Sequence, residues 1–376
     1  MTTTSSKNAT HVSSDDLTFA IFDWLDAPEG ADQADVLEGR LAMVEAADRG
    51  GEFAVYHMAE HHGTPLGLAP SPSVFIAAAS QRSSRIRLAP TVFVLPLYDT
   101  LRLAQEIGML DQLTRGRLEV GLGRGSVPIE GEFYGYSFTD MAKRYSELEP
   151  ALLKTLATEV YSPPPGEESH ATDLPLSVTT RQKPNPPLWY PTTNPESVPR
   201  LAKDGYNTLF GFAWFSPDNE EIGQVSDQYF AGVEHAAKNG GQRYAVPGHT
   251  PRFGTMRHVL VAETDEEAVA IAKPALDDFV VNFTFLMKRH DQLFPMELDF
   301  DTLRNGSKII VGSVDTVVDR MVDLITVGKL NHFAGVFSWG SLTGQPALKS
   351  LGLYQSQVIP RVREILLERG YTSPVL

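Results

Sequence analysis

Residues 53–83, FAVYHMAEHHGTPLGLAPSPSVFIAAASQRS, contain the pattern that decides the fold. Residues 53–59 form a short apolar run with the length of a buried strand, and residues 72–83 form a stretch of helical period. The polar loop between them carries His61 and His62. A strand, a polar loop and a helix in that order make up the repeating unit of α/β proteins.

The same unit recurs almost from one end of the chain to the other. Further strands are predicted at residues 17–25, 85–95, 117–122, 188–192, 208–212, 257–262 and 332–339. Helices are predicted at residues 34–49, 100–114, 142–157, 195–204, 219–238, 265–276, 314–327 and 345–369. Eight strands that are each followed by a helix favour a (β/α)8 TIM barrel. An open doubly wound sheet would need a glycine fingerprint after the first strand, and Asp26-Ala27-Pro28-Glu29-Gly30 has none.

The 376 residues are interpreted as one elaborated domain, because α/β barrels often exceed the usual length of a domain. Residues 1–16 are polar and are predicted to be a disordered arm, and residues 17–376 are predicted to form a single barrel. Two segments interrupt the rhythm. Residues 161–187 are rich in proline and predict an irregular insertion, and the aromatic residues 279–307 predict a lid-like insertion.

The composition excludes several classes of function. The chain has no cysteine, which rules out disulfides, thiolate metal sites and a cysteine nucleophile. Its net charge of −15, from 32 Lys+Arg against 47 Asp+Glu, argues against a nucleic-acid partner and against an anionic membrane surface. The N-terminus lacks the apolar core of a secretory signal, and no uncharged apolar run approaches the ~18 residues of a membrane span. We therefore expect a cytoplasmic protein whose partners are small molecules or other proteins.

Three histidines and a glutamate lie within six residues at the end of the second predicted strand: His57, Glu60, His61 and His62. Reactive side chains of barrel enzymes lie at such strand ends. Imidazole and carboxylate groups could bind a metal, or they could form a hydrogen-bonded loop. Since no second cluster has ligand spacing, no metal is predicted. A barrel metallohydrolase that uses His57, His61 and His62 remains the alternative from another class.

Six blocks in the first third of the chain, and four further blocks downstream, resemble a known family in order and spacing. The blocks are 59–62 (AEHH), 71–79 (SPSVFIAAA), 85–88 (RIRL), 94–97 (VLPL), 110–117 (LDQLTRGR), 121–125 (GLGRG), 194–197 (NPES), 202–205 (AKDG), 310–313 (IVGS) and 358–360 (VIP). They resemble the bacterial-luciferase-like flavin-dependent monooxygenases over roughly residues 17 to 365. The resemblance concerns fold and cofactor class, and it leaves the substrate open.

The resemblance implies a chemistry and a set of site residues. It implies a barrel that takes reduced FMN from a separate NAD(P)H:flavin reductase and uses O2 to oxygenate a small apolar substrate such as an aldehyde or ketone. His61 matches the family's catalytic histidine, and His62 stands beside it as a further catalytic candidate that orients the loop. The implied cofactor-binding residues are Thr91, Val92, Arg124, Arg144, Asn194, Glu196 and Ser197. The matching position of a cis peptide that is frequent in the family is Thr91–Val92. Gly123 stands where some luciferases have a reactive thiol.

Aromatic residues at strand ends predict an apolar substrate pocket, although inward aromatics of a barrel are also typical core residues. The predicted pocket residues are Phe22, Trp24, Trp214 and Trp339, with Phe283, Phe285 and Phe294 closing the cavity. A closed apolar cavity suits the chemistry because reactive oxygen intermediates survive only where water is excluded.

Three alternatives to the flavin-dependent monooxygenase stay open, and the oligomeric state is a separate expectation. The nearest alternative is a hydride-transfer enzyme of the same superfamily that uses the deazaflavin coenzyme F420. The others are the barrel metallohydrolase and a flavin-binding protein without catalysis. A homodimer is expected through residues 72–83 and 101–113.

Overall fold

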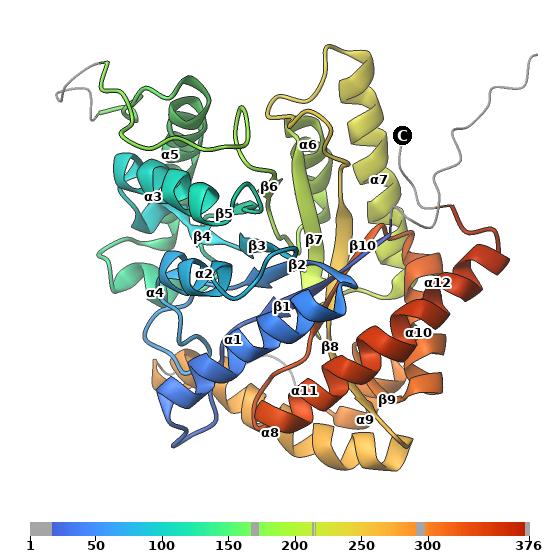
Figure 1. The fold of residues 1–376 in the computed structure, drawn as a ribbon. Coiled ribbons are helices and arrows are strands. Elements are labelled where there is room, and N and C mark those ends of the chain that lie inside the picture. Colours follow the sequence, from blue (N-terminus) through green and yellow to red (C-terminus); the bar gives the residue numbers. More distant parts are fainter. Residues whose placement is uncertain (1–16, 167–172, 213, 215, 291–297, 373–376) are drawn as a thin grey trace, which may run out of the picture.

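The computed structural model describes residues 17–166, 173–212, 214, 216–290 and 298–372 (Figure 1). The predicted arm, residues 1–16, lies outside the described residues. Within the described part of the chain, no helix has the length and apolar character that crossing a membrane requires.

A ring of parallel strands forms the centre of the molecule. The strands are β1 (Thr18–Asp23), β2 (Phe53–Met58), β3 (Arg87–Pro90), β4 (Phe93–Val94), β5 (Val120–Gly123), β6 (Leu188–Trp189), β7 (Tyr206–Phe212), β8 (Phe253–Ala262), β9 (Ile309–Ser313) and β10 (His332–Val336). Their order is β3-β2-β1-β10-β8-β7-β6-β5-β4, with β9 paired to β8 outside this path. Because β3 and β4 follow each other in one run of chain, the order leads back to its start. The predicted parallel barrel is confirmed, and it is nearly closed.

Helices surround this barrel (Figure 1). They are α1 (Gln33–Gly50), α2 (Pro72–Ser80), α3 (Thr100–Leu113), α4 (Pro128–Glu132), α5 (Phe138–Thr158), α6 (Val198–Asp204), α7 (Asn219–Lys238), α8 (Asp265–Arg289), α9 (Phe300–Asn305), α10 (Val314–Gly328), α11 (Gly344–Leu353) and α12 (Ile359–Glu368). Side-chain caps fix several helix starts: Asp32 accepts from the backbone N–H groups of Ala34 and Asp35, and Asp218 accepts from that of Glu221. These caps are visible in the sequence, which explains why α1 and α7 were predicted within a residue.

The structure corrects several predicted boundaries. The strand predicted at 85–95 is divided into β3 and β4, and the helix predicted at 345–369 is divided into α11, a π-helical turn (Tyr354–Val358) and α12. Strand β9 was missed, because residues 310–313 were interpreted only as a block of the family resemblance. The predicted lid-like insertion does not begin at residue 279, since α8 continues unbroken to Arg289. Phe279, Phe283 and Leu286 recur at helical spacing without a stop signal, so they continue the helix. Residues 291–297 and Phe294 with them lie outside the described residues.

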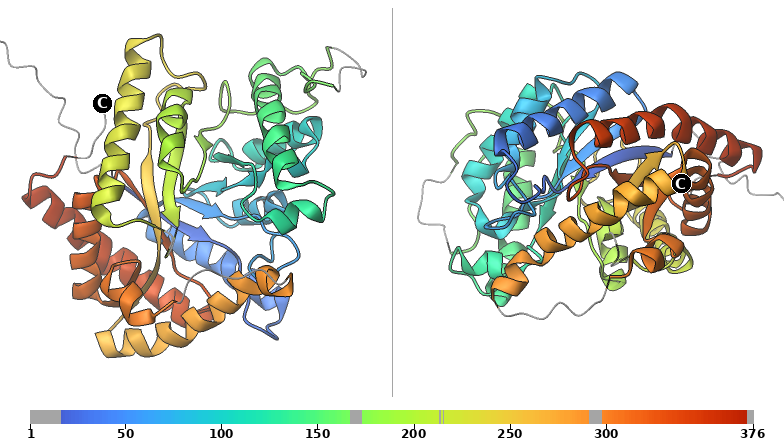
Figure 2. Two further views of the ribbon diagram at one scale, coloured as in Figure 1. Left: turned by 180° about the vertical axis from the view of Figure 1, so that it is seen from behind. Right: turned by 90° about the horizontal axis from the view of Figure 1, so that it is seen from below.

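Helix α8 crosses the end of the barrel at which the strands have their carboxyl ends (Figure 2, right). Midway along it, the Asn282 side chain donates to the Ala27 carbonyl at 2.9 Å and to Asp26 Oδ2 at 3.3 Å. Asp26 also accepts from the Gly340 backbone N–H at 2.7 Å and pairs with Arg40. Burial raises the pKa of Asp26 to about 7, against the lowering effect of Arg40. One buried carboxyl thus fastens α8 to the loops after β1 and β10.

Strand β5 approaches the segment between β3 and β4 more closely than a side chain would allow. The Thr91–Val92 peptide in that segment is cis, as the resemblance implies. A Cβ on Gly121 would lie 2.5 Å from the Pro90 carbonyl oxygen, and a Cβ on Gly123 would lie 2.5 Å from Val92 Cγ2. Glycine at these positions is therefore a packing requirement of barrel closure.

We predict that Gly123→Ala lowers the free energy of unfolding by about 1–3 kcal/mol, because the new methyl group collides with Val92. Urea unfolding measures this change. The matched control is Gly39→Ala in α1, where a Cβ meets nothing within 4 Å and helix propensity favours alanine. Equal stability of the two variants would contradict the packing account.

His258 of β8 lies in an aromatic box beneath α8. Its ring stacks between Trp24 at 5.5 Å and Trp214 at 5.8 Å between centroids, and the edges of Phe279 and Trp339 complete the box. Neither ring nitrogen of His258 has a hydrogen-bond partner within the described residues. Burial therefore lowers the pKa of His258 to about 3.

A neutral buried histidine makes stability depend on pH with a defined sign. The folded pKa of about 3 lies below the unfolded value of 6.5, so stability is lost as pH falls below about 6.5. We predict that His258→Phe, which keeps the stack, removes about 2 kcal/mol of the stability difference between pH 7.5 and pH 5. Urea unfolding of the wild-type protein and of His258→Phe at the two pH values measures the contribution of His258 to this difference. The contribution of Asp26 is the same in both proteins and cancels. An unchanged difference would refute the role given to His258.

Candidate active site

A cavity of about 870 Å³ lies at the carboxyl ends of the barrel strands, beneath α8. The loops after β1, β2, β4, β5 and β6 supply most of its wall, which is where barrels place their reactive groups. The lining residues are Phe22, Trp24, Ala59, Glu60, His61, Thr64, Leu66, Thr91, Val92, Val94, Gly123, Arg124, Gly125, Ser126, Val127, Glu130, Phe138, Tyr190, Pro191, Thr192, Thr193, Asn194, Ser197, Arg200, Phe212, Met256, Phe283, Leu286 and Met287.

His61 forms the central polar pair of the cavity with Glu130 of α4. The distance from His61 Nδ1 to Glu130 Oε1 is 2.9 Å, and both side chains are mostly buried. A carboxylate on one ring nitrogen fixes the tautomer of the imidazole, so Nδ1 donates to Glu130 and Nε2 is left to serve the cavity. Figure 2 (right) shows α4 beside the end of α8, which brings Glu130 to the same mouth.

Glu60 organises the loops around His61. Its Oε2 accepts from the Val94 backbone N–H at 3.0 Å and from the Tyr98 hydroxyl at 2.8 Å. Its Oε1 accepts from His62 Nε2 at 2.8 Å, and His62 Nδ1 accepts from the Tyr134 hydroxyl at 2.9 Å. With both ring nitrogens engaged, His62 does not line the cavity. Its position is that of a residue that orients the loop.

One end of the cavity concentrates positive charge. Arg124 follows β5, and its guanidinium lies 5.0 Å from the centre of the Phe138 ring. Within the described part of the chain, this guanidinium has no hydrogen bond or ion pair. Arg200 of α6 lines the same end, with one nitrogen paired to Asp204 at 3.0 Å. Both arginines oppose the rise in the pKa of Tyr190 that burial causes, and Tyr190 lines the same cavity. In a chain with a net charge of −15, they concentrate positive charge that suits an anion.

The cofactor-binding residues predicted from the resemblance separate into two groups. Thr91, Val92, Arg124, Asn194 and Ser197 line the cavity, and Arg144 and Glu196 do not. The Arg144 guanidinium lies over the Tyr136 ring at 4.5 Å, and its Nε donates to the Pro96 carbonyl at 3.1 Å. In this arrangement the Arg144 side chain supports the loop after β4, and its predicted contact with the cofactor stays a prediction.

The expectation of free backbone donors at residues 195–197 was wrong. These residues form a short 3-10 turn ahead of α6, and the Asn194 side chain accepts from the Glu196 N–H at 3.0 Å. The Ser197 N–H donates to the Asn194 carbonyl at 3.2 Å. The Ser197 hydroxyl lies 3.2 Å from Thr192 Oγ1 and lines the cavity, so the polar groups at this turn are side-chain hydroxyls.

The predicted pocket residues divide in the same way. Phe22, Trp24 and Phe283 line the cavity. Trp214 and Trp339 instead enclose His258 in the layer below. Phe285 directly precedes Leu286 and Met287 in α8 but, unlike them, does not line the cavity. Whether an inward-facing aromatic residue of a barrel strand lies in the core or in the cavity depends on its position along the strand. The alternation of residues in the sequence does not reveal that position.

Sequence reasoning missed several residues of the cavity, above all Glu130, Tyr190, Arg200 and Met287. Glu130 belongs to a helix of five residues, which is too short to show a period. The sequence does carry a signal for Arg200, because it follows Asn194 and Ser197 on the same turn and helix. Within the described residues, no three histidine, aspartate or glutamate side chains are grouped so that they could hold a metal ion. His57, required by the metallohydrolase alternative, lies inside the barrel against His332 and not beside His61.

Comparison with known proteins identifies relatives over most of the chain. The chain is 32% identical to the uncharacterized protein y4wF of Sinorhizobium fredii, over 92% of this chain and 97% of that protein. It is 26% identical to the oxygenase component of the flavin-dependent trigonelline monooxygenase of Acinetobacter baylyi, over 64% of this chain and 63% of that protein.

Solved structures share the fold. Monooxygenase RslO1 of Streptomyces bottropensis aligns with a TM-score of 0.79 at 22% identity, over 92% of this chain and 99% of that one. The oxygenating constituent of 3,6-diketocamphane monooxygenase of Pseudomonas putida was solved in complex with FMN. It aligns with a TM-score of 0.70 at 19% identity, over 92% of this chain and 98% of that one. The coenzyme F420-dependent tetrahydromethanopterin reductase of Methanopyrus kandleri aligns with a TM-score of 0.66 at 16% identity, over 92% of this chain and 99% of that one.

A family model described as luciferase-like monooxygenase matches residues 17–329, which include every strand of the barrel except β10. The predicted family is confirmed: the chain belongs to the luciferase-like monooxygenases.

Proposed function

We propose that this chain is the oxygenase of a two-component flavin monooxygenase that acts in the cytoplasm. It takes reduced FMN from a separate NAD(P)H:flavin reductase and uses O2 to oxygenate a small apolar substrate such as an aldehyde or ketone. The observation that carries the proposal is one cavity with a cationic end at Arg124 and Arg200, an apolar end beneath α8, and His61 with Glu130 between the loops.

The cationic end fits the phosphate of FMN. A dianionic phosphate needs several fixed donors, and the Arg124 guanidinium, which has no hydrogen bond or ion pair to any described residue, carries up to five N–H groups. Arg200 and the hydroxyls of Ser197, Thr192 and Thr193 line the same end. These groups would hold the phosphate, and they would favour FMN over riboflavin.

The middle of the cavity fits a flat, largely apolar ring system. Thr91, Val92 and Val94 border it from one side, and the glycine backbone at 123 and 125 removes side chains from the adjoining wall. When bound there, reduced flavin would supply the electrons that activate O2. The residues of this chain would hold the ring and limit its contact with water.

His61 would act on protons within the cavity. Because Glu130 holds Nδ1, the ring presents Nε2, which can donate or accept one proton at a reacting oxygen. Glu60 and His62 fix the loop that carries His61, so their role is positioning.

The opposite end of the cavity would hold the substrate. The apolar lining residues Phe22, Trp24, Leu66, Phe283 and Leu286 would form its wall. Such a wall binds apolar molecules through buried area and keeps water from the reaction. The names of the A. baylyi and P. putida relatives, an oxygenase component and an oxygenating constituent, support the need for a separate reductase.

The nearest alternative is hydride transfer with F420, which the fold shared with the M. kandleri reductase keeps open. The relatives named as monooxygenases and the FMN complex favour the oxygenase. Isotope labelling separates the two, because only an oxygenase transfers an atom of 18O2 to its product. A protein that binds flavin without catalysis would yield no product at all.

A homodimer stays a prediction. Val74 of α2 and Met109 and Leu113 of α3 are exposed, at 71%, 55% and 43%, and all three lie in the segments expected at the interface. Exposed apolar side chains on adjacent helices are typical of such surfaces.

We predict that Arg124→Gln weakens binding of FMN by about tenfold or more, because a charge-assisted hydrogen bond to phosphate is lost. Riboflavin lacks the phosphate, so its binding should change little. Anaerobic titrations with both reduced flavins measure the two affinities. Arg49→Gln, an exposed residue of α1 paired with Glu45, is the matched control. An equal loss for FMN and riboflavin would show that Arg124 does not bind the phosphate.

We predict that Glu130→Gln lowers the yield of oxygenated product per O2 consumed, because the amide no longer fixes His61 as the carboxylate does. General acid–base assistance of this kind contributes about 10²-fold or more to a rate. The measurement is product formed against hydrogen peroxide released. Glu132→Gln, two residues away and absent from the cavity wall, serves as control. Unchanged coupling in Glu130→Gln would remove the pair from the mechanism.

A further inference from the structure

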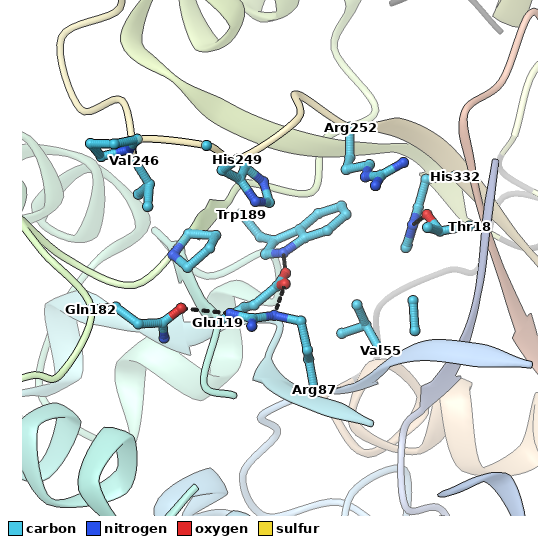
Figure 3. A pocket seen from close by; sticks show the side chains of 14 residues that line it. Thr18, Val55, Arg87, Glu119, Gln182, Trp189, Val246, His249, Arg252 and His332 are labelled. Carbon is cyan, nitrogen blue, oxygen red and sulfur yellow. Dashed lines mark hydrogen bonds and ion pairs between the residues drawn. The ribbon is translucent and has the colours of Figure 1, made fainter. Parts of the chain in front are cut away.

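A second cavity, of about 270 Å³, lies at the amino ends of the strands, opposite the candidate active site (Figure 3). Exposed residues Pro247 and Gly248 stand at its rim, so it meets solvent there. Its wall includes Thr18 at the start of β1 and His332 at the start of β10, which lie beside each other in Figure 3.

A continuous row of hydrogen-bonding groups leads from this cavity through the barrel to the other one. Thr18 Oγ1 lies 2.8 Å from His332 Nδ1. His332 Nε2 lies 3.2 Å from His57 Nε2, and His57 Nδ1 lies 2.9 Å from Thr91 Oγ1. Thr91 lines the cavity assigned to the flavin. The four side chains come from β1, β10, β2 and the end of β3, and therefore cross the barrel interior.

We propose that Thr18, His332, His57 and Thr91 form a proton relay that connects solvent at the amino end of the barrel with the flavin cavity. The inference that protons move towards the flavin cavity rests on the proposed function, because the inner end of the relay, Thr91, lines that cavity. The overall reaction of reduced FMN, O2 and substrate forms oxidised FMN, oxygenated product and one water. When reduced FMN binds as its monoanion, one of the two protons of that water must come from solvent.

The geometry allows two complementary arrangements of protons. In the first, Thr18 donates to His332 Nδ1, His332 Nε2–H donates to His57 Nε2, and His57 Nδ1–H donates to Thr91 Oγ1. In the second, every bond is reversed: Thr91 donates to His57 Nδ1, His57 Nε2–H donates to His332 Nε2, and His332 Nδ1–H donates to Thr18. The two histidines therefore carry opposite tautomers in both arrangements.

Delivery of one proton converts the first arrangement into the second. Thr18 takes up a proton from solvent and passes its original hydroxyl proton to His332 Nδ1, the Nε2 proton of His332 passes to His57 Nε2, and the Nδ1 proton of His57 passes to Thr91 Oγ1. The original hydroxyl proton of Thr91 then passes to an acceptor in the cavity. Each group gains one proton and releases one, so no net charge stays inside the barrel.

The surroundings suit a relay of neutral rings. Burial lowers the pKa of His57 to about 4, and burial lowers the pKa of His332 well below its ordinary value. Both rings are thus neutral near pH 7 and hold one proton each. Glu119 favours the charged form of His57, whereas His57, Arg252 and His249 disfavour the charged form of His332.

Trp189 holds the two rings in place. Its ring centroid lies 4.7 Å from that of His57 and 4.8 Å from that of His332. Its indole N–H donates to Glu119, which also pairs with Arg87 (Figure 3). The polar groups of the amino-end cavity thus fix the geometry that the relay requires. His57 and His332 act through Thr91 and do not touch the flavin cavity themselves.

The first test needs no flavin. Nitrogen-15 NMR of histidine-labelled full-length protein at pH 7.5 reports the tautomer of each ring, with His57→Gln used to assign the two signals. The relay predicts two neutral rings in opposite tautomers. The same tautomer in both rings, or a charged ring, would overturn it.

The second test measures oxidation of bound reduced FMN by O2, in H2O and D2O across pH. His57→Gln keeps a donor and an acceptor but cannot pass a proton by tautomer change, so the proton-dependent rate should fall about tenfold or more and its solvent isotope effect should be lost. His235→Gln, the same exchange at an exposed position of α7, is the control. Wild-type rate and isotope effect in His57→Gln would refute the relay.

Variants of Thr18 keep the test decisive if His57→Gln does not fold. Thr18→Val keeps the shape but removes the hydroxyl at the outer end, and it should reproduce the slower rate, with Thr18→Ser restoring it. Equal rates and isotope effects in the valine and serine variants would contradict the relay. If the wild-type protein does not bind reduced FMN, the proposed function fails, and the tautomers still decide whether the relay exists.

Discussion

The close approach of β5 to Thr91 and Val92 is the contact on which the rest of the structure depends. It requires glycine at positions 121 and 123, because a Cβ at either would collide with the opposite strand. This contact closes the barrel between β4 and β5. It also gives the candidate cofactor cavity one smooth wall, and it places Thr91 between that cavity and the buried histidines. Gly123 is thus a structural requirement here, where some luciferases carry a thiol.

The cavity combines a positively charged environment with an apolar one. Arg124 and Arg200 collect positive charge at one end, while Phe22, Trp24 and the α8 side chains make the other end apolar. Asp26 and Asn282 hold α8 across the mouth. A phosphate with an attached ring, placed next to an apolar substrate, matches this division. The polar pair of His61 and Glu130 then lies where protons are exchanged.

The parallel barrel and most helix limits followed from the sequence, because hydrophobic period and caps are local properties. Among the predicted site residues, His61, Thr91 and Arg124 follow closely after strands and line the cavity. Arg144, Trp214 and Trp339 do not line it, because the direction of a side chain depends on helix phase and on height along a strand. The pairing of His57 with His332 joins residues 275 positions apart, and no local pattern reveals such a contact.

The central claim is that the cavity at the carboxyl ends of the strands binds reduced FMN for reaction with O2. Anaerobic titration of the full chain with reduced FMN and, in parallel, with reduced F420 tests it most directly, followed by mixing with O2. The account predicts saturable binding of reduced FMN, one per chain, and rapid oxidation of the bound cofactor. Binding of F420 without binding of FMN, or a bound cofactor that is stable to O2, would contradict it.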